Sequence, residues 1–434
     1  MSHQNQSLDE LLHRAQSGRL TRRQVFRRAA ALGIGLPAMN AIWASEVAAQ
    51  GATPSASPAA AAPTGEPIRI GSSISSSGSN ARTGQYQLEA YKLWEAQKNA
   101  AGGLLGRPVQ MVIYDDQSDP STGSRLYERL LTEDQVDLVL GPYASSVTQA
   151  VAQITERYGQ PLLSAGASAG EIWERGFTSV FGVYSVAQDY FRDIILNIAT
   201  AQGYTTAAVI YEDTIFPTST ALGAIAHCET AGIEVVLEEK YPAEATDVSS
   251  VLTKVRDADP DMLIGGSYLP DSVLITRQSH ELGVNPRMYG FSVGAAQPDF
   301  FETLQADSDY VLGPSMWEPQ IVTEGNAAFL EEYQAMWNRE PDYHSATGYA
   351  GCQILERAVT NVGSIDLDGI REQLLSLVMP TVLPGEYRVD ETGKQIGHIP
   401  LTIQWQAGEK LIVAPENQVE GELLLPTPTW DERG

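Results

Sequence analysis

Cysteine and basic residues are scarce in this sequence of 434 residues. The two cysteines, Cys228 and Cys352, lie far apart in helical patterns, so we expect two free, buried thiols even in an exported protein. Lys and Arg number 28 against 54 Asp and Glu. Residues 50–434 hold 22 basic and 51 acidic residues, a net charge of −29. Such a body repels phosphate backbones and anionic lipid surfaces, so nucleic-acid binding is disfavoured.

Motifs that bind phosphate or calcium are absent. No GxxxxGK[ST] loop occurs. The stretch VIYDDQSDPSTGSRL holds Asp115, Asp116 and Asp119, but Pro120 stands where a calcium loop counted from Asp115 needs glycine. Aspartate followed by proline is instead typical of a helix start. We predict that Asp119 caps a helix from Pro120, that Asp115 and Asp116 lie at a strand end facing solvent or the carboxyl edge of the sheet, and that no metal site exists.

A long hydrophobic run is also lacking near the N-terminus. TRRQVF, residues 21–26, carries paired arginines, and the apolar run 29–39 that follows is too short to span a bilayer. EVAAQ then supplies small residues suited to cleavage. Residues 1–49 therefore resemble a twin-arginine export signal; the alternative is a cytosolic amphipathic helix with chance arginines. Residues 50–67, rich in Ala, Pro, Ser and Thr, are predicted to be a spacer.

Beyond the spacer, short apolar runs alternate with amphipathic helices in two blocks, 68–182 and 205–291. The expected strands are PIRIGSS, VQMVIY, DLVLGP and PLLSA in the first block, and TAAVIY, IEVVLEE, DMLIGG and RMYGF in the second. One expected helix spans residues 84–101, and another ends at Ala231. Four more are expected to begin at Pro120, Ser145, Asp247 and Asp271. This alternation predicts an α/β fold with parallel sheets covered on both faces. The tail is expected to be helical from about Glu324 to Leu377, with short strands near Glu386, Ile399 and Leu411 and a turn at 390–393.

A serine-nucleophile motif offers a rival function. Gly166-Ala-Ser168-Ala-Gly170 satisfies G-x-S-x-G directly after a strand, as in a hydrolase that uses Ser168. The candidate bases His227, His280, His344 and His398 all follow it in the chain. Against this, the run from Glu171 meets Gly176 after little more than one helical turn, whereas a nucleophile elbow needs a long helix. No acid–histidine pair stands in a recognisable setting either.

Five collinear blocks carry a resemblance to a known family. They are NAAGGLLGRPVQMVIYDDQSDP (99–120), GPYASSVTQA (141–150), PLLSAGASAGEIWERGF (161–177), LIGGSYLPDSVLITRQSHELG (263–283) and GEYRVDETGKQIG (385–397). Together they resemble the type I periplasmic solute-binding proteins of the branched-chain amino-acid and amide import group, the Leu/Ile/Val-binding-protein-like family. The resemblance implies two doubly wound parallel-sheet lobes with the ligand in the cleft between them. It also implies a three-crossing hinge, which we place near Ser185, Met316 and Gly397. Lobe 1 is then 68–184 with 317–396, and lobe 2 is 185–316 with 397–425.

The resemblance also implies ligand-binding residues. Ser145 aligns with the hydroxyl that holds a ligand carboxylate, and Gly166 and Ser168 align with a backbone and a hydroxyl contact. Phe216 and Tyr268 take the places of aromatic residues on the second lobe. These serines follow strands and precede helix starts, where free N–H groups bind anions without a cation. Further candidate wall residues are Tyr184, Arg82, Tyr343 and His344. The alternative for each is an ordinary packed or solvated side chain, and we favour that alternative for Arg82 and His344.

One position departs from the family pattern. Ser292 stands where amino-acid binders place an acid that pairs the ligand's ammonium group, and a buried ammonium without a counter-charge is costly. Either another acid reaches the cleft, with Glu212, Asp213 and Asp271 as candidates, or the ligand lacks an ammonium. The second option admits carboxylates, amides and aromatic acids.

The sequence therefore predicts an exported, non-enzymatic binding protein that delivers a small polar ligand to an ATP-driven importer. Its partners would be the ligand, an amino acid or amide-like compound, and membrane permease subunits; no cofactor is expected, and the protein is expected to be monomeric. It would reside in the periplasm or at the outer face of the cytoplasmic membrane. The same fold serving as a ligand sensor remains an alternative.

Overall fold

The structure is a computed structural model that describes residues 61–433. The predicted signal peptide and most of the predicted spacer lie outside the described residues. Within residues 61–433, no helix is long and apolar enough to cross a membrane.

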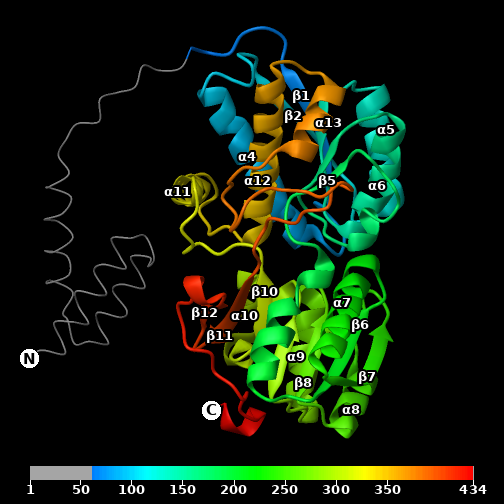
Figure 1. Ribbon diagram of the computed structural model, residues 1–434, viewed down its shortest axis with the longest axis vertical. Helices are drawn as coiled ribbons and strands as arrows, with labels where there is room; N and C mark the ends of the chain where they lie inside the picture. The colour runs from blue at the N-terminus through cyan, green and yellow to red at the C-terminus, as the bar shows by residue number, and fades with distance from the viewer. Residues whose placement is uncertain (1–60, 434) are drawn as a thin grey trace, which may run out of the picture.

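The first half of the fold is built on a five-stranded parallel sheet in the order β2-β1-β3-β4-β5 (Figure 1). Its strands are β1 (Ile68–Ile74), β2 (Val109–Asp115), β3 (Leu138–Leu140), β4 (Leu162–Ser164) and β5 (Val180–Gly182), and its connecting helices are α4 (Ala81–Ala100), α5 (Pro120–Thr132) and α6 (Ser145–Arg157). β3 and β4 are buried along their whole length, as expected of parallel strands covered on both faces. Helix α4 ends at Ala100, and shortly after it Gly103 adopts φ +81°, where a Cβ would lie 2.1 Å from the carbonyl oxygen of Arg107.

The second half is built on a seven-stranded sheet in the order β12-β11-β10-β9-β8-β6-β7. Its strands are β6 (Thr206–Glu212), β7 (Glu234–Tyr241), β8 (Met262–Gly266), β9 (Met288–Phe291), β10 (Leu312–Ser315), β11 (Leu401–Gln406) and β12 (Glu409–Ala414). Its helices are α7 (Ile215–Ala231), α8 (Ser249–Ala258), α9 (Leu269–Leu282) and α10 (Pro298–Leu304). Strands β6 to β10 run parallel; β11 pairs antiparallel with β10, and β12 pairs antiparallel with β11. The two sheets confirm the predicted α/β class.

The chain passes between the two sheets three times. It leaves the first sheet after β5 and enters the second at β6, then returns after β10 through α11 (Asn326–Trp337), α12 (Tyr343–Val362) and α13 (Leu367–Ser376). Helix α12 packs along α4 (Figure 1). The last passage leads to β11 and β12 in the second sheet.

His398 connects the three passages. Its Nδ1 lies 2.7 Å from the Ser185 hydroxyl and its Nε2 lies 2.9 Å from the Met316 carbonyl oxygen. Burial lowers the pKa of His398 to about 4, so the ring is neutral near pH 7 and donates from Nε2 to the carbonyl. The three positions expected at the crossings therefore lie together, although their action as a hinge stays a prediction.

Several expected element boundaries are confirmed. Helices begin at Pro120 and Ser145, and α7 ends at Ala231. Asp119 caps α5 by accepting the Thr122 N–H at 2.7 Å. Helix α9 begins at Leu269 rather than at Asp271, because Asp271 stabilises the helix start from inside the first turn. Likewise, α8 begins two residues after the predicted Asp247.

The tail corrects the sequence analysis. The predicted helical stretch consists of three helices, with α11 and α12 separated at 338–342 and α12 ended by Gly363 in the left-handed region. No strand forms near Glu386; that segment makes isolated bridges, such as Val389 with Gln395. Glycines with positive φ at Gly385 and Gly393 break the extended backbone there. The turn at 390–393 is present, and β11 starts only at Leu401.

The acidic stretch is structural. Asp116 is buried and accepts hydrogen bonds from the hydroxyls of Ser73 and Ser75, both at 2.7 Å. Of the two predicted alternatives for Asp116, exposure to solvent is wrong, because the end of strand β1 brings these serines over it. It follows the end of β2 at the carboxyl edge of the sheet, and burial raises its pKa. Asp115 accepts from Ser77 at the sheet edge. Cys228 and Cys352 are both free and buried, as predicted.

Candidate functional site

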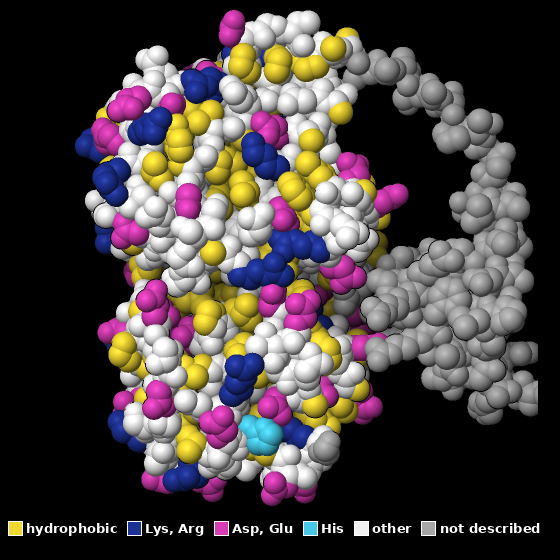
Figure 2. Space-filling view, turned by 180° about the vertical axis from the view of Figure 1, so that it is seen from behind, with side chains coloured by type: hydrophobic (Ala, Val, Ile, Leu, Met, Phe, Trp, Pro, Cys, Tyr) yellow, Lys and Arg dark blue, Asp and Glu magenta, His cyan; other side chains and the backbone are white. Residues whose placement is uncertain are grey.

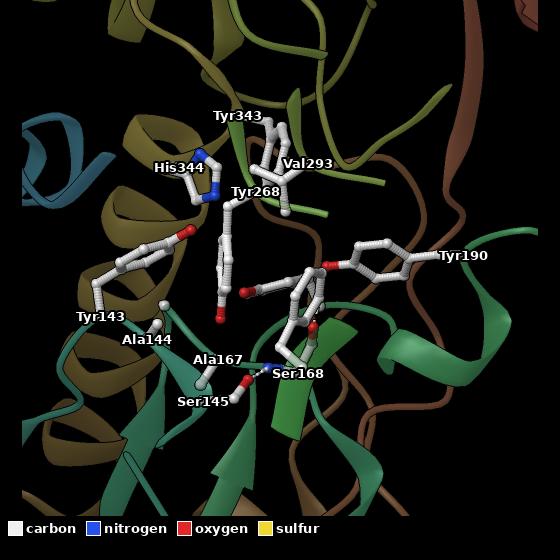
Figure 3. A pocket seen from close by; sticks show the side chains of 13 residues that line it. Tyr143, Ala144, Ser145, Ala167, Ser168, Tyr190, Tyr268, Val293, Tyr343 and His344 are labelled. Atoms are coloured by element: carbon white, nitrogen blue, oxygen red, sulfur yellow. Dashed lines mark hydrogen bonds between the residues drawn. The ribbon is translucent and has the colours of Figure 1, made fainter. Parts of the chain in front are cut away.

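A cavity lies where the carboxyl ends of strands from both sheets meet (Figure 3). The first half contributes Tyr143, Ala144 and Ser145 after β3, and Gly166, Ala167 and Ser168 after β4. The second half contributes Phe216, Tyr268 and Val293 after β6, β8 and β9. Tyr184 and Tyr190 on the first passage, and Tyr343 and His344 at the start of α12, complete the lining. Open parallel sheets bind ligands at this edge.

Two serines form the polar wall of the cavity. The Ser145 hydroxyl oxygen accepts the backbone N–H of Ser168 at 3.2 Å and that of Ala169 at 3.3 Å. A hydroxyl has one donor and two acceptor positions, so both acceptor positions of Ser145 are used and its proton remains to be donated. Among residues 61–433 this proton has no acceptor. The wall therefore presents donors to the cavity.

The start of helix α6 adds further donors to this wall. Ala144 occupies the N-cap position and offers no side-chain acceptor to the first turn. The first N–H groups of a helix have no partner within the helix, and the helix dipole favours negative charge beside them. Ala144 and Ser145 both line the cavity. A carboxylate or another acceptor is therefore the natural occupant of this side.

Gly166 allows the backbone to form this wall. A Cβ at Gly166 would lie 2.2 Å from the side-chain oxygen of Gln87 and 2.7 Å from the Pro142 carbonyl oxygen. Gln87 is held in place by the Tyr91 hydroxyl at 2.7 Å and the Gly141 carbonyl at 3.0 Å. Any larger residue at 166 would displace the strand ends that carry the serines.

Aromatic rings form the opposite wall. Phe216 contacts Tyr268 with ring centroids 5.4 Å apart and Tyr190 with centroids 5.5 Å apart. Phe216 comes from the first turn of α7 and Tyr268 from the turn before α9. Figure 3 shows the Tyr268 hydroxyl pointing across the cavity toward Ser145 and Ala167. The hydroxyl of Tyr190 lies 3.0 Å from that of Ser168, so the two walls meet.

The lining of the cavity carries no Asp, Glu, Lys or Arg. Burial raises the pKa of the Tyr143, Tyr184 and Tyr268 hydroxyls well above its usual value, so these groups stay protonated. His344 is occupied by Asp342, whose carboxylate oxygen lies 2.9 Å from its Nδ1. The polar groups of the lining are therefore hydroxyls, backbone groups and the His344 ring.

The side chains nearly fill the cavity. The space open to the centre of a water molecule is about 10 Å³, room for about one water. A ligand of several heavy atoms therefore enters only when the halves separate or the rings turn.

Polar contacts span the gap between the two halves beside the cavity. The guanidinium of Arg82 on α4 lies 2.7 Å from Asp299 on α10, and the Tyr86 hydroxyl donates to Asp299 at 3.2 Å. The Gln297 amide donates to the Thr83 hydroxyl at 3.0 Å. Figure 2 shows the waist between the halves, where hydrophobic and basic side chains are visible. These contacts exist only while the two halves are close.

The structure brings most of the predicted site residues together. Those that line the cavity are Ser145, Gly166, Ser168, Tyr184, Phe216 and Tyr268, joined by the wall candidates Tyr343 and His344. Ser292 lies outside the lining: its hydroxyl donates to the Ser267 carbonyl at 2.7 Å and accepts the Ser267 N–H at 2.9 Å. Arg82 also lies outside the lining, paired with Asp299.

None of the three acids considered as partners for an ammonium lines the cavity. Asp213 is exposed and pairs with Lys240 at 2.9 Å. Glu212 accepts from the Thr214 hydroxyl at 2.6 Å, and Asp271 accepts the Tyr268 N–H at 3.2 Å. Burial, together with the neighbouring Glu212, raises the pKa of Asp271 to about 7.

The sequence analysis missed Tyr143, Tyr190 and Val293 as lining residues. Tyr143 directly precedes the predicted Ser145 loop, and Val293 follows the predicted Ser292. Successive side chains of an extended chain point to opposite sides, and a pattern of strand ends does not say which side faces the cleft. Tyr190 lies in an irregular segment with no such signal.

The surroundings of Ser168 lack the parts of a hydrolase elbow. The segment after Ser168 forms a single 3₁₀ turn, Gly170–Ile172, instead of a long helix. The Ser168 hydroxyl lies 3.0 Å from the Tyr190 hydroxyl, and within the described chain none of the hydrogen bonds of Ser168 involves a histidine. A general base is therefore not positioned on this serine.

Comparison with known proteins places the chain in a family. The sequence pattern of the periplasmic binding protein family matches residues 67–409. The Leu/Ile/Val-binding protein homolog 7 of Brucella suis biovar 1 is 27% identical over 386 residues, which cover 85% of this chain and 96% of that protein.

Solved structures share the fold. The branched-chain amino acid transporter substrate-binding protein of Streptococcus pneumoniae, in complex with isoleucine, matches with a TM-score of 0.73 and 22% identity, covering 81% of this chain and 100% of that one. A solute-binding protein of an ABC transporter from Rhodopseudomonas palustris, in complex with 3,4-dihydroxy benzoic acid, matches with a TM-score of 0.72 and 18% identity, covering 81% and 98%. With the family pattern covering most of its length, and with the predicted fold and resemblance confirmed, this chain belongs to the periplasmic binding protein family.

Proposed function

We propose that this protein is the exported solute-binding component of an ABC importer. It captures a small ligand that carries a carboxylate or an amide in the cavity between the two sheets, and presents it to membrane permease subunits. It acts as a monomer without a cofactor and without chemistry of its own. The absence of a base on Ser168 supports binding rather than hydrolysis.

Lobe movement is the proposed mechanism. The moving units are 68–184 with 317–396 and 185–316 with 397–425, and the joint lies where His398 meets Ser185 and Met316. A ligand that contacts both walls favours the closed form, because only there are all its contacts made. The nearly filled cavity supports this order of events, since a solute enters only when the walls are apart.

One observation carries the proposal: the uncommitted proton of Ser145 faces a cavity built at the carboxyl ends of both sheets. It stands beside the open N-terminus of α6, so an acceptor group bound there is held without a cation. The ligands of the two related structures, isoleucine and 3,4-dihydroxy benzoic acid, both contain a carboxylate, which supports the same class here.

Two measurements test the proposal. A calorimetric screen of amino acids, amides and organic acids should find at least one compound that binds at a 1:1 ratio. Small-angle X-ray scattering should then show a smaller radius of gyration with that compound than without it. Binding without compaction would contradict lobe closure. Turnover of a chromogenic ester that Ser168→Ala abolishes would replace the proposal with hydrolysis.

A further inference from the structure

The presence or absence of charged side chains in the lining of the cavity determines which kind of carboxylate ligand it accepts. An amino acid brings two charges, and its ammonium group loses its water shell when the cavity closes. Burial of an unpaired ammonium is strongly unfavourable. The partner that could offset it is a carboxylate in the lining, and the lining of this cavity has none.

Acids close to the lining are already engaged. Asp342 lies 2.9 Å from Nδ1 of the lining residue His344 and accepts the backbone N–H groups of His344 and Ser345. Asp271 accepts the backbone N–H of Tyr268, and Glu212 accepts the Thr214 hydroxyl. Both are buried, at 4% and 7% exposure, and both belong to the framework of the second half behind its ring wall. Since Tyr268 lies on the cavity side, a ligand ammonium reaches neither acid directly while the ring keeps its place.

Position 292 confirms that no acid replaces them from β9. Ser292 turns away from the cavity and forms two hydrogen bonds with Ser267. The next residue, Val293, faces the cavity with an apolar side chain that is 2% exposed. The wall opposite Ser145 is thus apolar or phenolic throughout.

Donors, by contrast, are in surplus. The Ser145 hydroxyl has a proton to donate, the first turn of α6 has no side-chain cap, and Ala144 and Ser145 both line the cavity together with several phenolic side chains. A carboxylate satisfies donors of this kind without a metal or a basic side chain. One negative charge has a place here, and one positive charge does not.

We propose that the ligand is a monocarboxylate without an ammonium group, bound with its carboxylate at Ser145 and its uncharged body against Phe216 and Tyr268. This inference rests on the proposed function, because it assumes that the cavity is the solute site. The proposal distinguishes this chain from proteins that bind amino acids by a single functional group of the ligand, the ammonium.

Matched pairs of compounds isolate that group. The pairs are propanoate with alanine, 4-methylpentanoate with leucine, and 3-phenylpropanoate with phenylalanine; each pair differs only by the ammonium. Binding is measured by calorimetry at about pH 7.5 on the protein without its predicted signal peptide. For at least one pair, the affinity for the acid should exceed the affinity for the matching amino acid by about 100-fold or more. Compounds of three sizes are used because rotation of the Phe216 and Tyr268 rings determines how large a ligand the cavity accepts.

A pair of variants tests the charge of the opposite wall. Val293→Glu puts a carboxylate into the lining and should weaken binding of the preferred acid by at least about tenfold more than Val293→Gln does. Val322→Glu makes the same change in net charge at a position that is 68% exposed and should leave the affinity unchanged. Thermal unfolding of each variant confirms that it is folded.

The outcomes separate the two proposals. Equal or tighter binding of an amino acid, lost in Ser145→Ala, overturns the inference and leaves the proposed function standing. Binding of none of the six compounds also overturns the inference. In that case the proposed function is judged by whether a ligand from the wider screen depends on Ser145. If the Val293→Glu and Val293→Gln variants bind the acid with equal affinity, a negative charge in the lining does not affect binding of a carboxylate and the inference fails.

Discussion

The two walls of the cavity are made of different chemistry. In the first half, the polar part of the wall consists of the hydroxyls of Ser145 and Ser168, fixed by hydrogen bonds between neighbouring strand ends. The rings of Tyr143, Tyr343 and His344 also line that side. The wall of the second half consists of rings, Phe216 and Tyr268, that pack on each other. One wall sets the position of a polar group, and the other excludes water over the rest of the ligand. A fixed donor wall reads one functional group, whereas a wall of rotatable rings tolerates variation in the ligand body.

The largest expected effect comes from the donor wall. Ser145→Ala removes the free donor and leaves the Ser168 and Ala169 N–H groups without an acceptor, so affinity for the preferred acid should fall by about 10- to 100-fold. Ser146→Ala is the control, since this neighbour does not line the cavity. Calorimetry measures both. Equal affinities in the two variants would mean that the donor wall does not hold the ligand.

The ring wall should matter less for recognition. Phe216→Ala removes a protein ring that packs on the body of the ligand, so the affinity for every acid should fall by about tenfold. The ratio of the affinity for each acid to that for the matching amino acid should stay the same. Phe216→Leu, which keeps apolar volume, should lie between the variant and the native protein. A change in preference on losing this ring would show that the division between the walls is wrong.

The contacts that join the two halves should have a smaller effect. Arg82→Gln and Asp299→Asn each remove an ion pair that spans the gap, with 46% and 16% of the two side chains exposed. Partly exposed pairs contribute about 0.2–1 kcal/mol, so each change should weaken ligand binding by about two- to fivefold through the closed population. The double variant should add nothing further.

Arg371→Gln breaks an ion pair within one helix, with Asp368, and serves as the control for charge. A double variant that is as weak as the product of the two single effects would mean that Arg82 and Asp299 act separately rather than as a pair.

The smallest expected effect concerns pH and the acids behind the ring wall. Because the pKa of Asp271 is raised to about 7, the folded protein keeps a proton that the unfolded chain releases above about pH 4. Its contribution to stability is therefore lost as pH rises from about 4 to about 7. Asp271→Asn should reduce the drop in melting temperature between pH 5 and pH 8 by about 2 °C or more.

Asp213→Asn is the matched control for that measurement, since Asp213 is exposed and paired with Lys240. A pH profile for Asp271→Asn that matches the native one would show that Asp271 holds no extra proton in the folded protein.

The residues of the donor wall were predicted from the family resemblance, which implied Ser145, Gly166 and Ser168. A local signal supported this prediction, because these serines follow predicted strands and Ser145 begins a predicted helix, and strand ends and helix caps depend on nearby residues. Asp119 was predicted from the same kind of local signal and caps α5 as expected. The parallel sheets followed from the alternation of apolar runs with helices.

Side-chain direction and long-range packing were not predictable. Ser292 and Val293 are neighbours, yet only Val293 faces the cavity, because the register of β9 against β8 decides which one turns inward. Strand β10 was missed because its position depends on pairing with β11, which lies about 90 residues further along the chain. A sequence pattern does not show which distant segments a sheet brings together. The bridges near Glu386 likewise depend on glycines whose turns only the folded chain displays.

The most direct test of the two-wall account is a crystal structure with the tightest-binding of the three acids. The account predicts its carboxylate within hydrogen-bond distance, about 2.6–3.2 Å, of the Ser145 hydroxyl and the first N–H groups of α6, with its body against Phe216 and Tyr268. A carboxylate held instead by the phenols of the second half, or a ligand bound outside this cavity, would contradict it.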